Sequence, residues 1–204
     1  MSEILGTHSQ LSAHLWEGFT GSKYRPSMAE IEQLLSRCSA FIFLGMERFM
    51  GNITPAKLAA LNLSDCNLAL LFDLVQNSKS VARQSDLDKD KSPGQRALEG
   101  PLETALILSL GGVGSIALNQ WHSSFQLNTQ HMASVLEGLL KDKLTSGQAV
   151  HSLRKGQNPS PRSAKEKVTP NVNDHVPHID AQTPLLTPAA YNCVLYGLPN
   201  LIVP

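Results

Sequence analysis

The chain has 204 residues, a formal net charge of +0, 17% charged residues and 42% hydrophobic residues. This length suits one domain with a substantial core, and the balanced charge provides no basic surface for nucleic acid or an anionic membrane. We expect no secretory signal and no membrane span, because the basic start and the long apolar run that these need are missing. The three cysteines, Cys38, Cys66 and Cys193, lack the spacing of a zinc site, which favours free thiols in a cytoplasmic, reducing compartment.

Residues 27–155 alternate between helical periodicity and short apolar runs. Ser27 and Glu30 have the spacing of a capping box, which predicts the start of a helix. Buried strands are predicted at the apolar runs 40–44, 68–72 and 115–121. Further helices are predicted after Thr54, after Pro101, over 127–144 and from Ser146. This order predicts an α/β fold, a mostly parallel sheet with helices on both faces.

Two polar segments interrupt this pattern. Residues 76–96 contain the charged run 86–91 and are too long for a compact connection, so we expect a mobile loop within the core. Residues 156–187 hold almost no large apolar side chain and are expected to be a disordered insertion. Strand character returns within 188–204, where 191–196 predicts an edge strand between two prolines, followed by a C-terminal tail.

Residues 1–26 are expected to form an N-terminal helical segment. Leu11, Leu15, Trp16 and Phe19 recur at helical spacing. Trp16 and Phe19 are the candidate interface residues, because aromatic side chains dominate interface energetics. One short helix covers only part of a sheet face, so we expect the isolated chain to self-associate or to be stabilised by a larger assembly.

Polar side chains follow all three predicted parallel strands. Ligands of open parallel sheets bind outside the carboxyl ends of the strands, and Glu47, Asp73 and His122 lie there. These three residues form a candidate polar rim. One interpretation is a metal or acid–base site; the other, which we favour, is a set of solvated residues such as most sheets of this kind carry. We expect no cofactor, no metal and no small-molecule ligand.

Five segments, taken in order, resemble a CHAT domain, the caspase- and separase-like α/β module often found after tetratricopeptide repeats. The segments that carry the resemblance are 41–46, 53–65, 68–74, 111–121 and 188–197. The resemblance implies a caspase-like fold that is truncated at the N-terminus, because the opening strand and helix of the family are weak or absent here.

The chain departs from this family at the catalytic positions. The histidine position of the family falls near Met46, and its cysteine position falls near Asp73 or Leu74. A cysteine protease needs a thiolate beside a histidine that takes its proton, and none of these side chains supplies that pair. Cys66 precedes its strand, at the opposite end of the sheet. The resemblance therefore implies a pseudoenzyme with a degenerate site and no enzymatic activity.

A degenerate domain of this kind, together with the stretch 43–49, resembles part of a large repeat protein of the ciliary central apparatus. The resemblance implies a non-catalytic interaction or scaffold module of the axoneme, in the cytoplasm and cytoskeleton of the cilium. Its expected partners are other axonemal proteins or the rest of a larger repeat protein, with no nucleic acid, membrane or small molecule. The alternative is a caspase-like cysteine peptidase or another hydrolase with a non-standard site. Cys66 or Cys193 within hydrogen-bond reach of His122 would favour that alternative.

Overall fold

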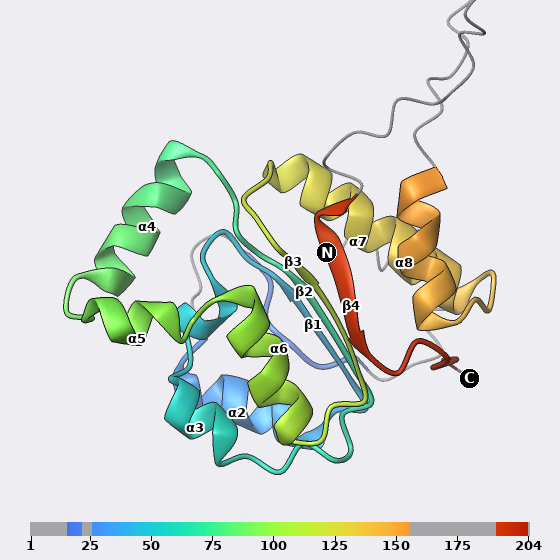
Figure 1. The fold of residues 1–204 in the computed structure, drawn as a ribbon, viewed down its shortest axis with the longest axis horizontal. Helices are drawn as coiled ribbons and strands as arrows, with labels where there is room; N and C mark the ends of the chain where they lie inside the picture. Colours follow the sequence, from blue (N-terminus) through green and yellow to red (C-terminus); the bar gives the residue numbers. More distant parts are fainter. Residues whose placement is uncertain (1–15, 22–25, 156–190, 204) are drawn as a thin grey trace, which may run out of the picture.

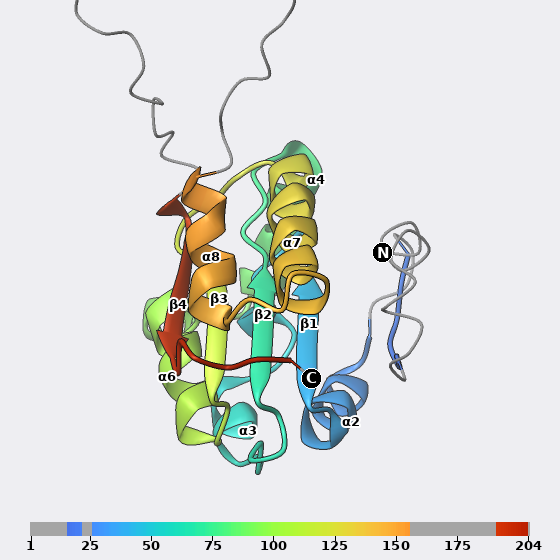
Figure 2. The same ribbon diagram turned by 90° about the vertical axis from the view of Figure 1, so that its right-hand side faces the viewer.

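A four-stranded sheet with helices on both faces forms the centre of the computed structural model, which describes residues 16–21, 26–155 and 191–203 (Figures 1 and 2). The elements are, in chain order, α2 (Met28–Arg37), β1 (Ala40–Leu44), the 3₁₀ helix η2 (Phe49–Gly51), α3 (Pro55–Ala59), β2 (Leu68–Phe72), α4 (Ser78–Asp88), α5 (Pro93–Ala97), α6 (Pro101–Leu110), β3 (Ser115–Asn119), α7 (Phe125–Leu140), α8 (Ser146–Lys155) and β4 (Cys193–Gly197). The predicted α/β class is confirmed.

The strands lie in the order β1-β2-β3-β4. The pairs β1–β2 and β2–β3 are parallel, with Ile42 opposite Leu70 and Ala69 opposite Ile116. β4 runs antiparallel to β3 at the edge of the sheet. The mostly parallel sheet and the edge position of the last strand are therefore confirmed, and the third strand ends at Asn119, two residues before its predicted end.

Strand β2 is buried at every position because each face of the sheet is covered. Successive side chains of a strand point to opposite faces. Ala69 and Leu71 accordingly pack with α2, α3 and α6, whereas Leu68, Leu70 and Phe72 pack with α7 and α8. Figure 2 shows α7 and α8 over one face of the sheet. Two apolar clusters, one for each face, make up the core.

Local signals begin and end α2 and α6 as predicted, whereas α7 begins two residues before and ends four residues before its predicted bounds of 127–144. The Ser27 hydroxyl accepts a hydrogen bond from the Glu30 N–H, and the Glu30 carboxylate accepts one from the Ser27 N–H, which completes the capping box. α6 ends before Gly111 and Gly112, and Gly112 has a φ of +111°. A Cβ on Gly112 would lie 2.9 Å from the Ser64 Cα, so this turn between α6 and β3 requires glycine.

The predicted loop over 76–96 is wrong, because this segment folds into α4 and α5. Asn77 caps α4 by accepting from the Ser80 N–H at 2.8 Å. Ser92 and Gln95 form a capping box at α5. The polar composition concealed these helices, since ion pairs and hydrogen bonds rather than a broad apolar face hold α4 against the rest of the chain.

The predicted N-terminal helix is described only over residues 16–21, which contain no helix or strand. The rest of that segment, and the predicted disordered insertion over 156–187, lie outside the described residues. The prediction of disorder stays untested.

Candidate functional site

Asp73 directly follows the buried strand β2, in the region where the carboxyl ends of the parallel strands meet. Its Oδ2 accepts a hydrogen bond from the Phe49 N–H at 2.8 Å. Its backbone carbonyl accepts from the side-chain amides of Asn119 at 3.1 Å and Asn128 at 2.8 Å. Burial raises the pKa of Asp73 to about 7, against the opposing effects of the Phe49 N–H and the Arg48 charge. Asp73 therefore joins η2, β3 and α7 to the end of β2.

Arg48 is the centre of an ion-pair network beside Asp73. Its Nη2 lies 2.6 Å from Asp88 Oδ1 and 2.9 Å from Glu99 Oε2. Lys91 Nζ lies 2.6 Å from Glu99 Oε1. The Gln84 side chain accepts from the Arg48 N–H at 3.0 Å and donates to Asp88 Oδ1 at 3.1 Å. This network attaches α4 and the α5–α6 connection to the chain that follows β1, which explains why a polar segment is folded there.

Replacing Arg48 by methionine should lower the free energy of unfolding by about 2 kcal/mol. Glu99, whose side chain is 3% exposed, would then keep Lys91 as its cationic partner but lose the guanidinium. Urea unfolding measures the loss. The double variant Arg48→Met/Glu99→Gln should lose less than the sum of the two single variants, because the buried group at position 99 is then uncharged and no longer needs the guanidinium. Strict additivity of the two losses would contradict the coupling.

The three predicted rim residues do not form one site. Glu47 is buried, and its Oε2 lies 3.6 Å from Arg83 Nη1. Asp73 is also buried, but its carboxylate accepts a hydrogen bond from the Phe49 N–H, and His122 is exposed. Within residues 16–21, 26–155 and 191–203, no hydrogen bond or ion pair joins any two of the three. The favoured interpretation as solvated residues is therefore wrong for Glu47 and Asp73, because both are buried, one beside Arg83 of α4 and the other on the backbone N–H of Phe49 in η2.

The positions of the degenerate family site lie in the same region. Met46 is half-buried, and Asp73 and Leu74 are buried. Leu74 adopts a φ of 58°, a conformation that is uncommon for residues other than glycine. Its carbonyl accepts a hydrogen bond from the Ser123 N–H at 2.9 Å, which holds the turn after β2 against the chain after β3. These contacts give Asp73 and Leu74 structural roles.

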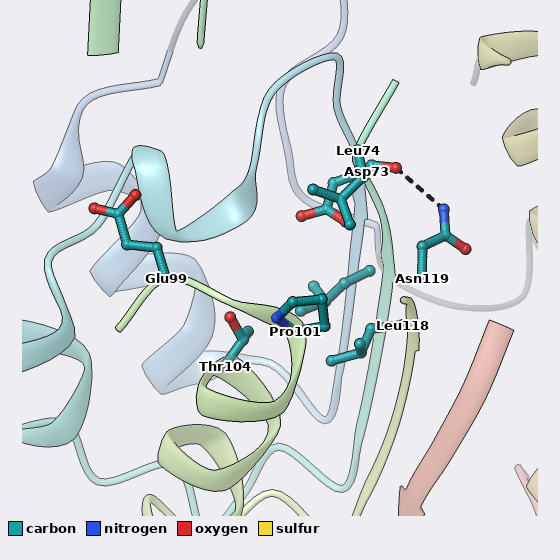
Figure 3. Close-up of a pocket in the computed structure, with 8 residues that line it drawn as sticks. Asp73, Leu74, Glu99, Pro101, Thr104, Leu118 and Asn119 are labelled. Carbon is teal, nitrogen blue, oxygen red and sulfur yellow. Dashed lines mark hydrogen bonds between the residues drawn. The ribbon is translucent and has the colours of Figure 1, made fainter. Parts of the chain in front are cut away.

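A small cavity lies between Asp73 and α6 (Figure 3). Its volume is about 10 Å³, which is room for about one water molecule. Figure 3 shows Asp73 and Leu74 on one side and Pro101 and Thr104 of α6 on the other, with the Glu99 carboxylate directed away from Asp73. The cavity is lined by Leu71, Asp73, Leu74, Glu99, Pro101, Thr104, Leu118 and Asn119. A space of this size holds no peptide or cofactor.

Asparagines are the residues of this region that sequence reasoning missed. Besides Asn119 and Asn128, Asn192 accepts hydrogen bonds from the N–H groups of Gln120 and Trp121 at 2.9 and 2.8 Å. Its side-chain amide donates to the Trp121 carbonyl at 2.9 Å. Asn192 thereby connects the start of β4 to the chain that follows β3. The available signal was the position of Asn119 near the end of one predicted strand and of Asn192 near the start of another, where amides pair with free backbone groups.

Among the described residues, no cysteine is hydrogen-bonded to His122. Cys66 lies at the amino end of β2, where its thiol contacts Cys38. Cys193 lies opposite Asn119 in the sheet, packs on the α7–α8 side and is buried, which raises its pKa to about 12. The described part of the chain contains no hydrogen bond between a cysteine and a histidine, and no group of three or more His, Cys, Asp or Glu that could hold a metal ion.

The chain is similar to "Cilia- and flagella-associated protein 46" of Chlamydomonas reinhardtii. The two sequences are 33% identical over 119 residues, or 58% of this chain. The matched region covers 4% of the length of the algal protein, so the comparison concerns a small piece of a much longer chain. The similarity supports the ciliary resemblance that the stretch 43–49 suggested. No family model matches the sequence, and the CHAT resemblance stays a prediction.

None of the helices in the described ranges has the length and apolar character needed to cross a membrane.

Proposed function

We propose that the chain is a non-catalytic protein-interaction module of a ciliary axoneme, in the assembly of the central apparatus. The observation that carries the proposal is a row of exposed leucines along α6, preceded by one exposed leucine at the C-cap of α5. The row consists of Leu98, Leu102, Leu106 and Leu110, and we call it the leucine row. Its partners are other axonemal proteins or further parts of a large ciliary protein.

Helix α6 is apolar on two opposite sides. Ala105 and Leu108 are 2% and 0% exposed and pack in the core under the sheet. Leu102, Leu106 and Leu110 are 50%, 54% and 86% exposed and recur every four residues, which places them on the same side of the helix. A helix that is apolar all round is normally buried on all sides, so the outer side of α6 favours a protein partner.

The residues at and beside the degenerate family site also favour a scaffold role. Asp73 and Arg48 are engaged in contacts between secondary structure elements, and the cavity beside them has a volume of about 10 Å³. The peptidase alternative would need a thiol beside His122, whereas Cys66 lies next to Cys38 at the other end of the sheet. A non-catalytic module accounts for these features with fewer assumptions.

The cellular location rests on the similar algal protein, whose name associates it with cilia and flagella. The chain matches 4% of the length of that algal protein. Placement in the central apparatus and binding to its proteins are therefore proposed for this one module and not for a whole protein.

The leucine row should be required for binding to axonemes. The variant Leu106→Glu should reduce co-sedimentation of the purified chain with isolated ciliary axonemes at least about tenfold, because it buries a charge in an apolar contact. Its free energy of unfolding should change by less than about 0.5 kcal/mol, as is usual at exposed positions. The matched control is Val81→Glu on α4, since Val81 is 62% exposed and lies outside the row.

The proposed surface is wrong if Leu106→Glu binds axonemes as well as the unmodified chain does. The sequence-based interface is a separate arm of the same test, because Trp16 and Phe19 are 36% and 44% exposed. Trp16→Ala should weaken binding if that segment takes part.

The peptidase alternative predicts activity-dependent labelling of Cys66 by a cysteine-reactive peptide probe, lost in His122→Ala. We expect no such labelling.

A further inference from the structure

The fold brings together two thiols that lie 28 residues apart in the sequence. Cys38 caps the C-terminus of α2, and Cys66 lies in the turn before β2. Their Sγ atoms are 3.8 Å apart, within hydrogen-bond contact for sulfur. The backbone at this corner is held in place, since the Cys66 N–H donates to the Leu63 carbonyl and the Asn67 N–H donates to the Ser39 carbonyl at 2.8 Å.

The two cysteines differ in access. Cys38 is half-buried, and Cys66 is fully buried among core residues. When Cys38 is ionised, the Cys66 thiol can donate to it, and this hydrogen bond lowers the pKa of Cys38. The contact with Cys38, together with burial, raises the pKa of Cys66. Cys38 is therefore the thiol that ionises first and that a small oxidant reaches first.

We propose that Cys38 and Cys66 form a reversible disulfide, a covalent modification site at the amino ends of β1 and β2, with a small-molecule disulfide such as glutathione disulfide as the oxidant. Disulfides in reducing compartments are usually transient and redox-sensing, which is the class this pair fits. The buried neighbour acts as the resolving thiol.

The reaction proceeds by two thiol–disulfide exchanges. The Cys38 thiolate attacks one sulfur of glutathione disulfide, which forms a mixed disulfide and releases one glutathione thiolate that takes up the Cys38 proton. Cys66 then gives up its proton and attacks Cys38 Sγ, which displaces the second glutathione thiolate, and that thiolate takes up the proton. Two protein thiols have lost two electrons and two protons, and one glutathione disulfide has become two molecules of glutathione.

The cross-link would close a loop that contains β1, η2 and α3. A closed loop of this length restricts the unfolded chain and so stabilises the folded state. Oxidation should raise the Tm by roughly 5 to 10 °C. The effect would tighten the corner between α2 and the first two strands without touching the leucine row on α6.

The test is oxidation of the reduced, folded chain by glutathione disulfide, followed by alkylation and mass spectrometry. We expect a loss of two hydrogens and a cross-linked peptide pair containing Cys38 and Cys66, both reversed by excess reduced glutathione. Cys193→Ser should retain the cross-link, because Cys193 packs on the opposite face of the sheet. Cys38→Ser should abolish it, and Cys66→Ala should accumulate the glutathione adduct at Cys38.

Three results would overturn the proposal: a stable glutathione adduct on Cys38 in the unmodified chain, a cross-link that forms only in urea, or one that lowers the Tm. Mapping in the unmodified chain decides the question even if Cys66→Ala fails to fold.

Discussion

Replacing Asp73 by asparagine should remove the contribution of this carboxyl to the pH dependence of the free energy of unfolding between pH 3.8 and about 7. Burial raises the pKa of this carboxyl from 3.8 in the unfolded chain to about 7 in the folded one, so the folded state keeps a proton that the unfolded state releases. The contribution of Asp73 to stability is therefore greatest below pH 3.8 and falls as the pH rises towards 7. A shift of about 3 pH units corresponds to a loss of about 4 kcal/mol.

Urea unfolding of both proteins across this pH range measures the effect as the difference between two curves, in which the contributions of other groups cancel. Asp73→Asn keeps an oxygen that accepts from the Phe49 N–H, so it should match the unmodified chain at acid pH and exceed its stability above pH 7. Asp73→Ala is the matched control. It loses the acceptor, which should cost about 1 to 3 kcal/mol at acid pH. Parallel curves for the unmodified chain and the Asp73→Asn variant would show that this carboxyl does not titrate with folding.

Replacing Phe49 by alanine should lower the free energy of unfolding by about 3 to 5 kcal/mol. Phe49 is 1% exposed, and its ring centroid lies 5.7 Å from that of Phe41 and 5.3 Å from that of Phe43. The variant would leave a cavity under β1 and remove both aromatic contacts. Denaturant unfolding at one pH gives the loss directly.

Two controls bracket that result. Phe49→Leu retains most of the buried volume and should cost less than about 1.5 kcal/mol. Val81→Ala, at a position 62% exposed, should change stability by less than about 0.5 kcal/mol. A loss below about 1 kcal/mol for Phe49→Ala would mean that η2 repacks freely and is not a fixed part of the core.

The sequence predicted where the residues of the candidate site lie in the fold, but it did not predict that two of them are buried. Strand ends are local features, so Glu47 and Asp73 could be assigned to the carboxyl ends of β1 and β2 from the sequence. Their burial could not, because the groups that contact them come from elsewhere in the chain: Arg83 of α4 lies beside Glu47, and the Phe49 N–H of η2 donates to Asp73. His122 was assigned to the same region and is exposed there.

The sequence by itself determined the α/β class, the capped helix starts and the three parallel strands, because apolar periodicity, capping pairs and glycine turns act within a few residues. Only the tertiary structure decided that 76–96 is helical, since Arg48 stabilises α4 through contacts with Gln84 and Asp88, which lie 36 and 40 residues away in the sequence. It also decided that Cys38 meets Cys66 and that one side of α6 stays uncovered. These outcomes depend on which faces pack together, and a residue pattern within one segment does not specify the segment it will meet.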